Sequence, residues 1–258
     1  MDPDPAGGKQ QVIAANFDHV FIMSSLNKDF NISRIERYLA LAWQSGASPI
    51  VVLTKADLVG DTKPAAELVE AAAFGVDVIP LSIISGVGME RLNAYLTPGS
   101  TAVFLGMSGV GKSSLLNTLM EREVMEVRAI REDDGRGRHT TTRRQLFMLR
   151  SGAMVIDTPG MRSLGMWEAD DGLSDTFSDV EKLLGACRFS DCRHEAEPGC
   201  AVLAALESGE LPAGRWENYN SLKRETLYAM DRSAALREKF ERNKSIARWS
   251  RQRKKEIW

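Results

Sequence analysis

A glycine-rich loop at residues 106–113 carries the clearest chemical signal in the chain. It reads GMSGVGKS and fits the pattern G-x-x-x-x-G-K-[ST] at every fixed position. A strand-like run precedes it and a helix-like run follows it, which disfavours the alternative of a plain glycine-rich turn. Backbone N–H groups of such a loop surround phosphate, and the following helix N-terminus adds positive potential. We expect Lys112 to reach the β- and γ-phosphates of a nucleotide and Ser113 to bind Mg²⁺, within a set comprising Gly106, Ser108, Gly109, Val110, Gly111, Lys112, Ser113 and Ser114.

A second phosphate-related motif, DTPG, occupies residues 157–160 at the end of an apolar run. A carboxylate in this position contacts Mg²⁺ through water, which predicts that role for Asp157. The Gly160 N–H is placed to sense the γ-phosphate. The motif is weak alone, but its position after a phosphate loop makes it strong.

The stretch VVLTKADL, residues 51–58, resembles a loop that reads a guanine base. The Asp57 carboxylate would accept hydrogen bonds from N1–H and the N2 amino group of guanine. Adenine presents an acceptor where guanine has a donor, so Asp57 argues against the alternative of an ATPase. We expect Lys55 to pack along the base, while Thr54, in place of the commoner Asn, loosens the loop.

A companion loop follows at residues 81–88, LSIISGVG. Ser82 is expected to order the Asp57 carboxylate, and the Ile83 N–H is available to the base oxygen. Both base-reading segments precede the phosphate loop, whereas the usual order is the reverse. The chain is therefore predicted to be circularly permuted, with LTPGS at 96–100 joining what are normally the two termini.

Cysteine and histidine cluster in CRFSDCRHEAEPGC, residues 187–200. The spacing C-x4-C-x-H-x5-C offers three thiolates and one imidazole, a tetrahedral set with no open position. We therefore predict a structural zinc site with the ligands Cys187, Cys192, His194 and Cys200. The alternative is three buried cysteines with an unrelated histidine, but the polar residues between them are poor core residues.

Strands and helices are expected to alternate from residue 12 to about residue 165, which predicts a doubly wound, mostly parallel α/β sheet. A helix over 33–46 is expected to open with a capping box of Ser33 and Glu36, and to bury Ile35, Leu39 and Ala42. The predicted domains are an α/β domain at 12–170 and a helical zinc-binding domain at 175–258. Residues 1–11 are interpreted as an N-terminal remnant or tag.

Composition favours a folded protein: 258 residues, 43% hydrophobic and 26% charged, with a net charge of -2. The last 44 residues hold thirteen Lys and Arg against six Asp and Glu, a surplus of seven positive charges. Such a basic tail indicates a polyanionic partner, with nucleic acid the first candidate; the alternative is a solvated helical face. No apolar run suits a membrane span and no secretory signal is evident, so we expect a cytoplasmic protein without membrane contact.

Together these residues resemble the circularly permuted ribosome small-subunit-dependent GTPase A family (RsgA/YjeQ). The resemblance rests on TKADL, GMSGVGKSSLLN, GRHTTT at 137–142, DTPGMR and the cysteine cluster. It implies a GTPase that acts late in assembly of the small (30S) ribosomal subunit, slow alone and stimulated by that subunit. The implied partners are GTP, GDP and the subunit with its 16S rRNA, and we expect a monomer. The family typically carries an N-terminal OB-fold, whereas about ten residues stand in that place here.

The resemblance also implies catalytic residues. Met161 stands where Ras-like proteins place the glutamine that orients water, and His139 is the candidate replacement. Thr140 or Thr141 would supply a further hydroxyl to Mg²⁺; Lys112 and Thr141 complete the catalytic set. The alternative for His139 is an exposed histidine that contacts rRNA or nothing. At the level of the whole protein, the alternative is a non-enzymatic, zinc-dependent RNA-binding switch controlled by guanine nucleotide.

Overall fold

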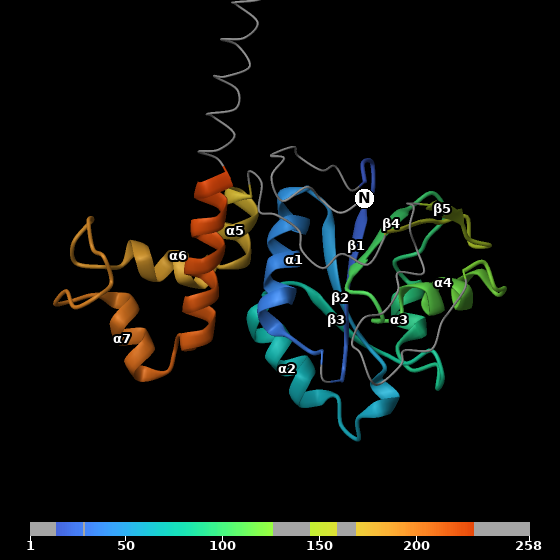
Figure 1. Cartoon of the computed structure of the whole chain (residues 1–258), viewed down its shortest axis with the longest axis horizontal. Helices are drawn as coiled ribbons and strands as arrows, with labels where there is room; N and C mark the ends of the chain where they lie inside the picture. Colours follow the sequence, from blue (N-terminus) through green and yellow to red (C-terminus); the bar gives the residue numbers. More distant parts are fainter. Residues whose placement is uncertain (1–13, 28, 126–144, 159–168, 230–258) are drawn as a thin grey trace, which may run out of the picture.

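The computed structural model describes residues 14–27, 29–125, 145–158 and 169–229. Figure 1 shows an α/β unit beside a smaller unit of helices, with helix α1 (Ile32–Gln44) facing helix α5 (Asp170–Thr176) where the two units meet. The described residues contain no helix with the length and hydropathy needed to span a lipid bilayer.

Six strands form a single sheet in the order β3-β2-β1-β4-β6-β5. All neighbouring pairs are parallel except β5 with β6. Most of the strands are apolar along their length because both faces of a parallel sheet are covered. The strands are β1 (His19–Ser25), β2 (Ser48–Thr54), β3 (Asp77–Leu81), β4 (Thr101–Gly106), β5 (Gln145–Met148) and β6 (Met154–Asp157).

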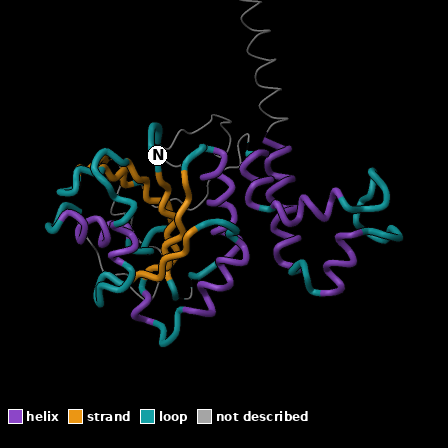
Figure 2. The backbone as a smooth tube through the Cα atoms, turned by 180° about the vertical axis from the view of Figure 1, so that it is seen from behind, coloured by secondary structure: helices purple, strands orange, loops and turns teal. Residues whose placement is uncertain are grey.

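Helices cover both faces of this sheet, and Figure 2 shows the strands between them. One core joins α1 and α2 (Lys63–Ala72) to one face through residues such as Leu39 and Val69. The other core joins α3 (Met89–Asn93) and α4 (Lys112–Met120) to the opposite face through Leu92 and Leu115. The sheet is therefore doubly wound, as predicted. The helices after the adjacent strands β1 and β4 lie on opposite faces, and ligands bind at such a switch point.

Helix α1 begins differently from the prediction. Its N-cap is Asn31, whose side chain accepts a hydrogen bond from the Arg34 N–H, so the capping box of Ser33 and Glu36 is wrong. The predicted buried face is confirmed, because Ile35, Leu39 and Ala42 are all buried. Glu36 is buried as well, and this carboxylate contacts the helical unit instead of capping its own helix.

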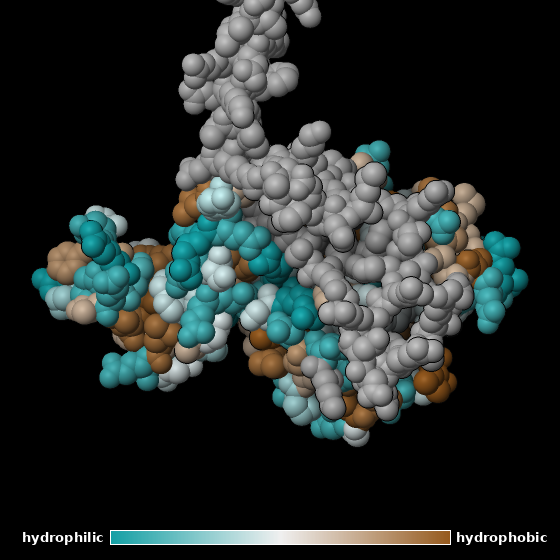
Figure 3. All heavy atoms as spheres, in the orientation of Figure 1, coloured by the Kyte–Doolittle hydropathy of each residue, from teal (hydrophilic) through white to brown (hydrophobic). Residues whose placement is uncertain are grey.

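The helical unit has its own apolar core. It contains α5, α6 (Ser178–Gly185), α7 (Ala201–Ser208) and a further helix described over 213–229. Side chains including Phe177, Val202 and Tyr219 pack together inside it. In the space-filling view, hydrophobic residues of this unit show in patches between hydrophilic ones (Figure 3). Helix α5 lies between the two predicted domains, so the boundaries at 170 and 175 stay predictions.

Several contacts attach this unit to α1, among them the following two. Gly172 of α5 lies so close to α1 that an added Cβ would come within 1.9 Å of the Ala40 carbonyl oxygen. Arg215 donates to Glu36 at 2.6 Å and to Asp179 at 2.7 and 2.8 Å. The Arg215 and Glu36 side chains are 9% and 2% exposed, so this ion pair is withdrawn from water. We refer to Glu36, Asp179 and Arg215 as the helical joint.

Candidate nucleotide-binding site and metal cluster

The phosphate loop connects the end of β4 to the start of α4. Gly106 is required where the loop begins, because an added Cβ would lie 2.6 Å from the Met23 carbonyl oxygen of the neighbouring strand. Gly111 takes a φ of 103°, a conformation that side chains rarely adopt. The loop therefore delivers Lys112 and Ser113 to the N-terminal turn of α4, as the motif predicted.

Lys112 is folded into the loop. Its ammonium donates to the carbonyl oxygens of Gly106 at 2.7 Å and Met107 at 2.8 Å, and the residue is 7% exposed. Burial lowers the pKa of Lys112 to about 8, while the negative charge of Asp157 opposes that shift. A neighbouring polyphosphate would favour the ammonium form and raise this pKa.

Asp157 is fully buried at the carboxyl end of β6. The adjacent Thr158 donates its hydroxyl to the Phe104 carbonyl oxygen at 2.6 Å, which fixes the end of β6 against β4. The carboxylate thus lies at the strand end next to the phosphate loop. Oxygen ligands such as Asp157 and the Ser113 hydroxyl suit Mg²⁺.

The base-reading loop leaves the end of β2. Lys55 adopts a left-handed φ of 59°, after which Ala56–Leu58 forms a short 3-10 helix that presents Asp57. Ser82 donates its hydroxyl to Asp57 at 2.5 Å. The same hydroxyl accepts the backbone N–H groups of Ile84 and Ser85, each at 3.2 Å. The expected contact between Ser82 and Asp57 is present.

Thr54 was expected to loosen the base-reading loop because it replaces the commoner Asn. In the structure its side chain contacts the phosphate loop. Its hydroxyl donates to the Val110 carbonyl oxygen in the phosphate loop at 2.6 Å. Thr54 therefore ties the base-reading loop to the phosphate loop, and the looser hold expected from its difference from Asn stays a prediction.

Between these loops lies a cavity of about 220 Å³. This volume is below the roughly 300–1,000 Å³ of sites that enclose a whole drug-sized ligand, as suits a pocket for one end of a nucleotide. The sequence prediction missed four apolar residues of the lining, although each of them neighbours a recognised motif. The lining consists of the predicted Thr54, Lys55, Asp57, Ile83, Val110, Gly111 and Ser114, and the missed Leu58, Leu81, Ile84 and Leu115.

Several predicted residues lie outside the described ranges. They are the candidates for γ-phosphate sensing, Mg²⁺ binding and water orientation: Gly160, Thr140, Thr141, His139 and Met161.

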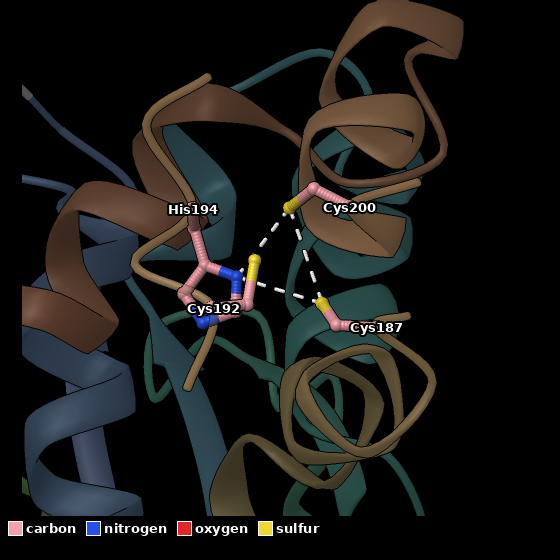
Figure 4. Close-up of side chains that lie close together, drawn as sticks. All are labelled: Cys187, Cys192, His194 and Cys200. Carbon is pink, nitrogen blue, oxygen red and sulfur yellow. Dashed lines mark hydrogen bonds between the residues drawn. The ribbon is translucent and has the colours of Figure 1, made fainter. Parts of the chain in front are cut away.

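The metal cluster is assembled in the helical unit. The His194 Nδ1 atom lies 3.6 Å from the Cys187 sulfur and 3.4 Å from the Cys200 sulfur, and the two sulfurs are 3.9 Å apart (Figure 4). Cys192 completes the set, with all four ligand atoms within 4.8 Å of one another. Zinc bonds of about 2.0–2.3 Å imply tetrahedral edges of about 3.3–3.8 Å. The two nitrogen–sulfur distances lie within this range and the 3.9 Å sulfur–sulfur distance lies just above it, an arrangement that suits a zinc ion.

Two neighbours hold the ligand loop in shape. The half-buried Glu197 carboxylate accepts backbone N–H groups from Arg193, Ala196 and Glu195, which lowers the pKa of Glu197 to about 2. The indole of Trp216 meets the edge of the His194 ring at a centroid distance of 5.6 Å. The loop is therefore fixed from its own backbone and from the helix over 213–229.

The sheet order, the phosphate loop and the base-reading loops that precede it define a circularly permuted P-loop GTPase. A model of the RsgA GTPase family matches residues 3–167. The chain belongs to this family.

Its relatives carry a name in common. The chain is 52% identical over 229 residues to small ribosomal subunit biogenesis GTPase RsgA 2 of Listeria monocytogenes, covering 88% of this chain and 66% of that relative. It is 48% identical over 246 residues to small ribosomal subunit biogenesis GTPase RsgA of Streptomyces coelicolor, covering 92% and 67%. The chain thus spans about two thirds of the length of the curated relatives it matches.

Solved structures agree with the fold. The crystal structure of YjeQ from Thermotoga maritima has a TM-score of 0.59 at 31% identity and covers 82% of this chain and 72% of that one. YloQ, described as a circularly permuted GTPase, has a TM-score of 0.55 at 30% identity and covers 81% and 69%. Both likenesses support the fold, and the likeness to YloQ also supports the permuted order of the motifs.

Proposed function

We propose that this chain binds GTP and GDP, hydrolyses GTP and assists late assembly of the small ribosomal subunit. The observation that carries the proposal is the Asp57–Ser82 pair, set at a cavity that continues into the phosphate loop. A carboxylate held there accepts two hydrogen bonds from guanine and has no donor for adenine. The names of the relatives, small ribosomal subunit biogenesis GTPases, support the ribosomal role.

The proposed chemistry is phosphoryl transfer to water. Lys112 would turn from the Gly106 and Met107 carbonyls toward the β- and γ-phosphates and neutralise charge that builds up on them. Ser113 and Asp157, with Thr140 or Thr141, would hold Mg²⁺, which stabilises the same charge. Gly160 would contact the γ-phosphate, and His139 would orient the attacking water.

The metal cluster has a structural role in this proposal. Its four protein ligands leave no open position for chemistry. A zinc ion there would cross-link the loop over 187–200 to the helical core through Cys200, which is buried and caps α7. The ion would thereby maintain a surface that docks on the subunit.

The proposed partner is 16S rRNA. The helical unit and the basic segment from Arg215 onward would contact it. The protein would act as a monomer in the cytoplasm, where small subunits are assembled. By analogy with Ras, whose unassisted turnover is about 3–5 × 10⁻⁴ s⁻¹, we expect slow hydrolysis in isolation and strong stimulation by the subunit.

The test is steady-state GTP hydrolysis with and without purified small ribosomal subunits. The proposal expects slow turnover alone, at least tenfold stimulation by the subunit, and loss of both in Lys112→Ala. Turnover above about 1 s⁻¹ without a partner would contradict the expected dependence on the subunit. Tight GTP binding with no hydrolysis under either condition would favour the non-enzymatic switch instead.

A further inference from the structure

We propose that the metal cluster and the helical joint are energetically coupled through Arg215 and Trp216, so that zinc bound in the helical unit helps to hold that unit in place on α1. This inference rests on the zinc site proposed above. It goes beyond a local structural role of the ion, because it links metal binding to the contact between the two units.

The zinc ligands are remote from α1. They lie in and beside the loop between α6 and α7, on the side of the helical unit that faces away from the sheet (Figure 1). Two helices nevertheless lead from this loop toward α1. They are α6, which ends two residues before Cys187, and the helix over 213–229, whose first turn carries Arg215 and Trp216.

Arg215 connects this first turn to both units. Its guanidinium donates to Glu36 of α1 at 2.6 Å and to Asp179 of α6 at 2.7 and 2.8 Å. It also donates to the carbonyl oxygens of Ala72, the residue at the end of α2, at 3.3 Å and of Thr176 in α5 at 2.9 Å. The Arg215 side chain is 9% exposed, so a shift of this turn would break several bonds that form largely away from water.

Trp216, the next residue, contacts the zinc loop. Its indole meets the edge of the His194 ring at a centroid distance of 5.6 Å and stacks on the Tyr219 ring at 5.8 Å. Tyr219 donates its hydroxyl to Glu181 of α6 at 2.6 Å. A zinc ion that fixes the His194 ring would therefore also fix the turn that holds Arg215.

One apolar core follows the same path. It includes Ala40 of α1, the zinc ligand Cys200 and Phe177, all of them buried. The Phe177 ring also lies under the Arg215 guanidinium, 4.6 Å from its carbon to the ring centroid. Close-packed interiors transmit displacements from one side to the other. Because linkage is reciprocal, zinc that favours the docked helical unit must itself bind more tightly when the unit is docked.

The first test measures the Kd of zinc for the reduced, full-length protein by competition with a chelator of known affinity. The variants are Glu36→Gln, Trp216→Leu and the two combined. Arg37→Gln is the matched control. Arg37 also joins α1 to the helix over 213–229, through Glu225 at 2.6 and 2.9 Å, but that contact lies nine residues beyond Trp216.

We expect Glu36→Gln to weaken zinc binding by about tenfold, inside the 5- to 150-fold range typical of coupled sites, although Glu36 lies on the far side of the joint. Trp216→Leu should weaken zinc binding as well. The combined variant should lose less than the product of the two effects, because both changes act on one route. Arg37→Gln should change the Kd of zinc by less than about twofold.

The second test uses the wild-type protein alone. The Gly172 N–H of α5 donates to the Gln44 side chain of α1 at 3.0 Å, so its hydrogen exchange reports on the contact between the units. Removal of zinc with a chelator should speed exchange at Gly172 by at least about fivefold and leave the amides of α4 unchanged.

A wild-type protein that binds no zinc would contradict the proposed zinc site, and the inference with it. Three results would overturn the inference alone while the zinc site stands. They are an unchanged Kd of zinc in Glu36→Gln, an equal loss in Arg37→Gln, and unchanged exchange at Gly172 after zinc is removed.

Discussion

The Ser82 hydroxyl lies 2.5 Å from an Asp57 carboxylate oxygen, although the two residues follow different strands of the sheet. Because Ser82 also accepts the Ile84 and Ser85 N–H groups, its oxygen is fixed by its own loop before it meets Asp57. The carboxylate is thereby held in one orientation at the rim of the cavity. Base recognition depends on this orientation.

Replacing Ser82 with Ala should therefore weaken GDP binding without removing it. The carboxylate stays, but a hydrogen bond to a charged group, valued at about 1.5–3 kcal/mol, is lost, so we expect the Kd to rise by about 10- to 100-fold. Calorimetric titration with GDP measures the change. Ser85→Ala is the matched control, since Ser85 contributes its backbone N–H to the same contact. Equal affinities in the two variants would argue against a role for the Ser82 hydroxyl.

The pKa of Lys112 predicts a pH dependence of nucleotide affinity. In the free protein this pKa is lowered to about 8, and neighbouring phosphates would raise it in the complex. The complex then holds more protons than the free protein above pH 8. Affinity for GDP should be level below pH 8 and fall above it, by at most about tenfold per pH unit.

Fluorescence titration between about pH 6.5 and 9 tests this expectation. In Lys112→Arg the guanidinium stays charged over the whole range, so any remaining affinity should not fall in this way. A level profile in the wild-type protein, or the same decline in both proteins, would contradict the assignment to Lys112.

Removal of the metal should destabilise the helical unit more than the α/β unit. Cys192→Ala leaves three ligands, and we expect it to lose zinc and to lower the Tm of the helical unit by about 10 °C or more. Metal content by mass spectrometry and thermal unfolding by differential scanning calorimetry report the two effects. Zinc-free wild-type protein that unfolds at an unchanged temperature would show that the cluster is not structural.

The helical joint predicts a large loss of stability when its arginine is removed. Arg215→Ala leaves the buried Glu36 carboxylate without its ionic partner, which costs about 3–5 kcal/mol. Denaturant unfolding measures this loss. The control is Arg224→Ala on the same helix, where the side chain is exposed and donates to the Asn220 carbonyl oxygen. Similar free energies of unfolding for the two variants would show that the joint contributes little.

The phosphate loop, the strands and the cysteine cluster were predictable because their signals are local. GMSGVGKS specifies its loop within eight residues, and the cluster lies within fourteen. The Thr54–Val110 bond was not predictable in this way, since it depends on which strand neighbours the phosphate loop in the folded sheet. The capping role predicted for Glu36 was wrong for a similar reason. Its partner Arg215 is 179 residues away in the chain, so their contact could not be predicted from the local pattern.

The most direct test of the account is the affinity of GDP and of xanthosine diphosphate for the wild-type protein and for Asp57→Asn. Xanthine carries a carbonyl oxygen where guanine carries its N2 amino group, so a carboxylate repels it and an asparagine amide can donate to it. We expect the wild type to prefer GDP by at least about 100-fold, and Asp57→Asn to reverse that preference. Unchanged preference for GDP in Asp57→Asn would contradict the claim that Asp57 reads the base.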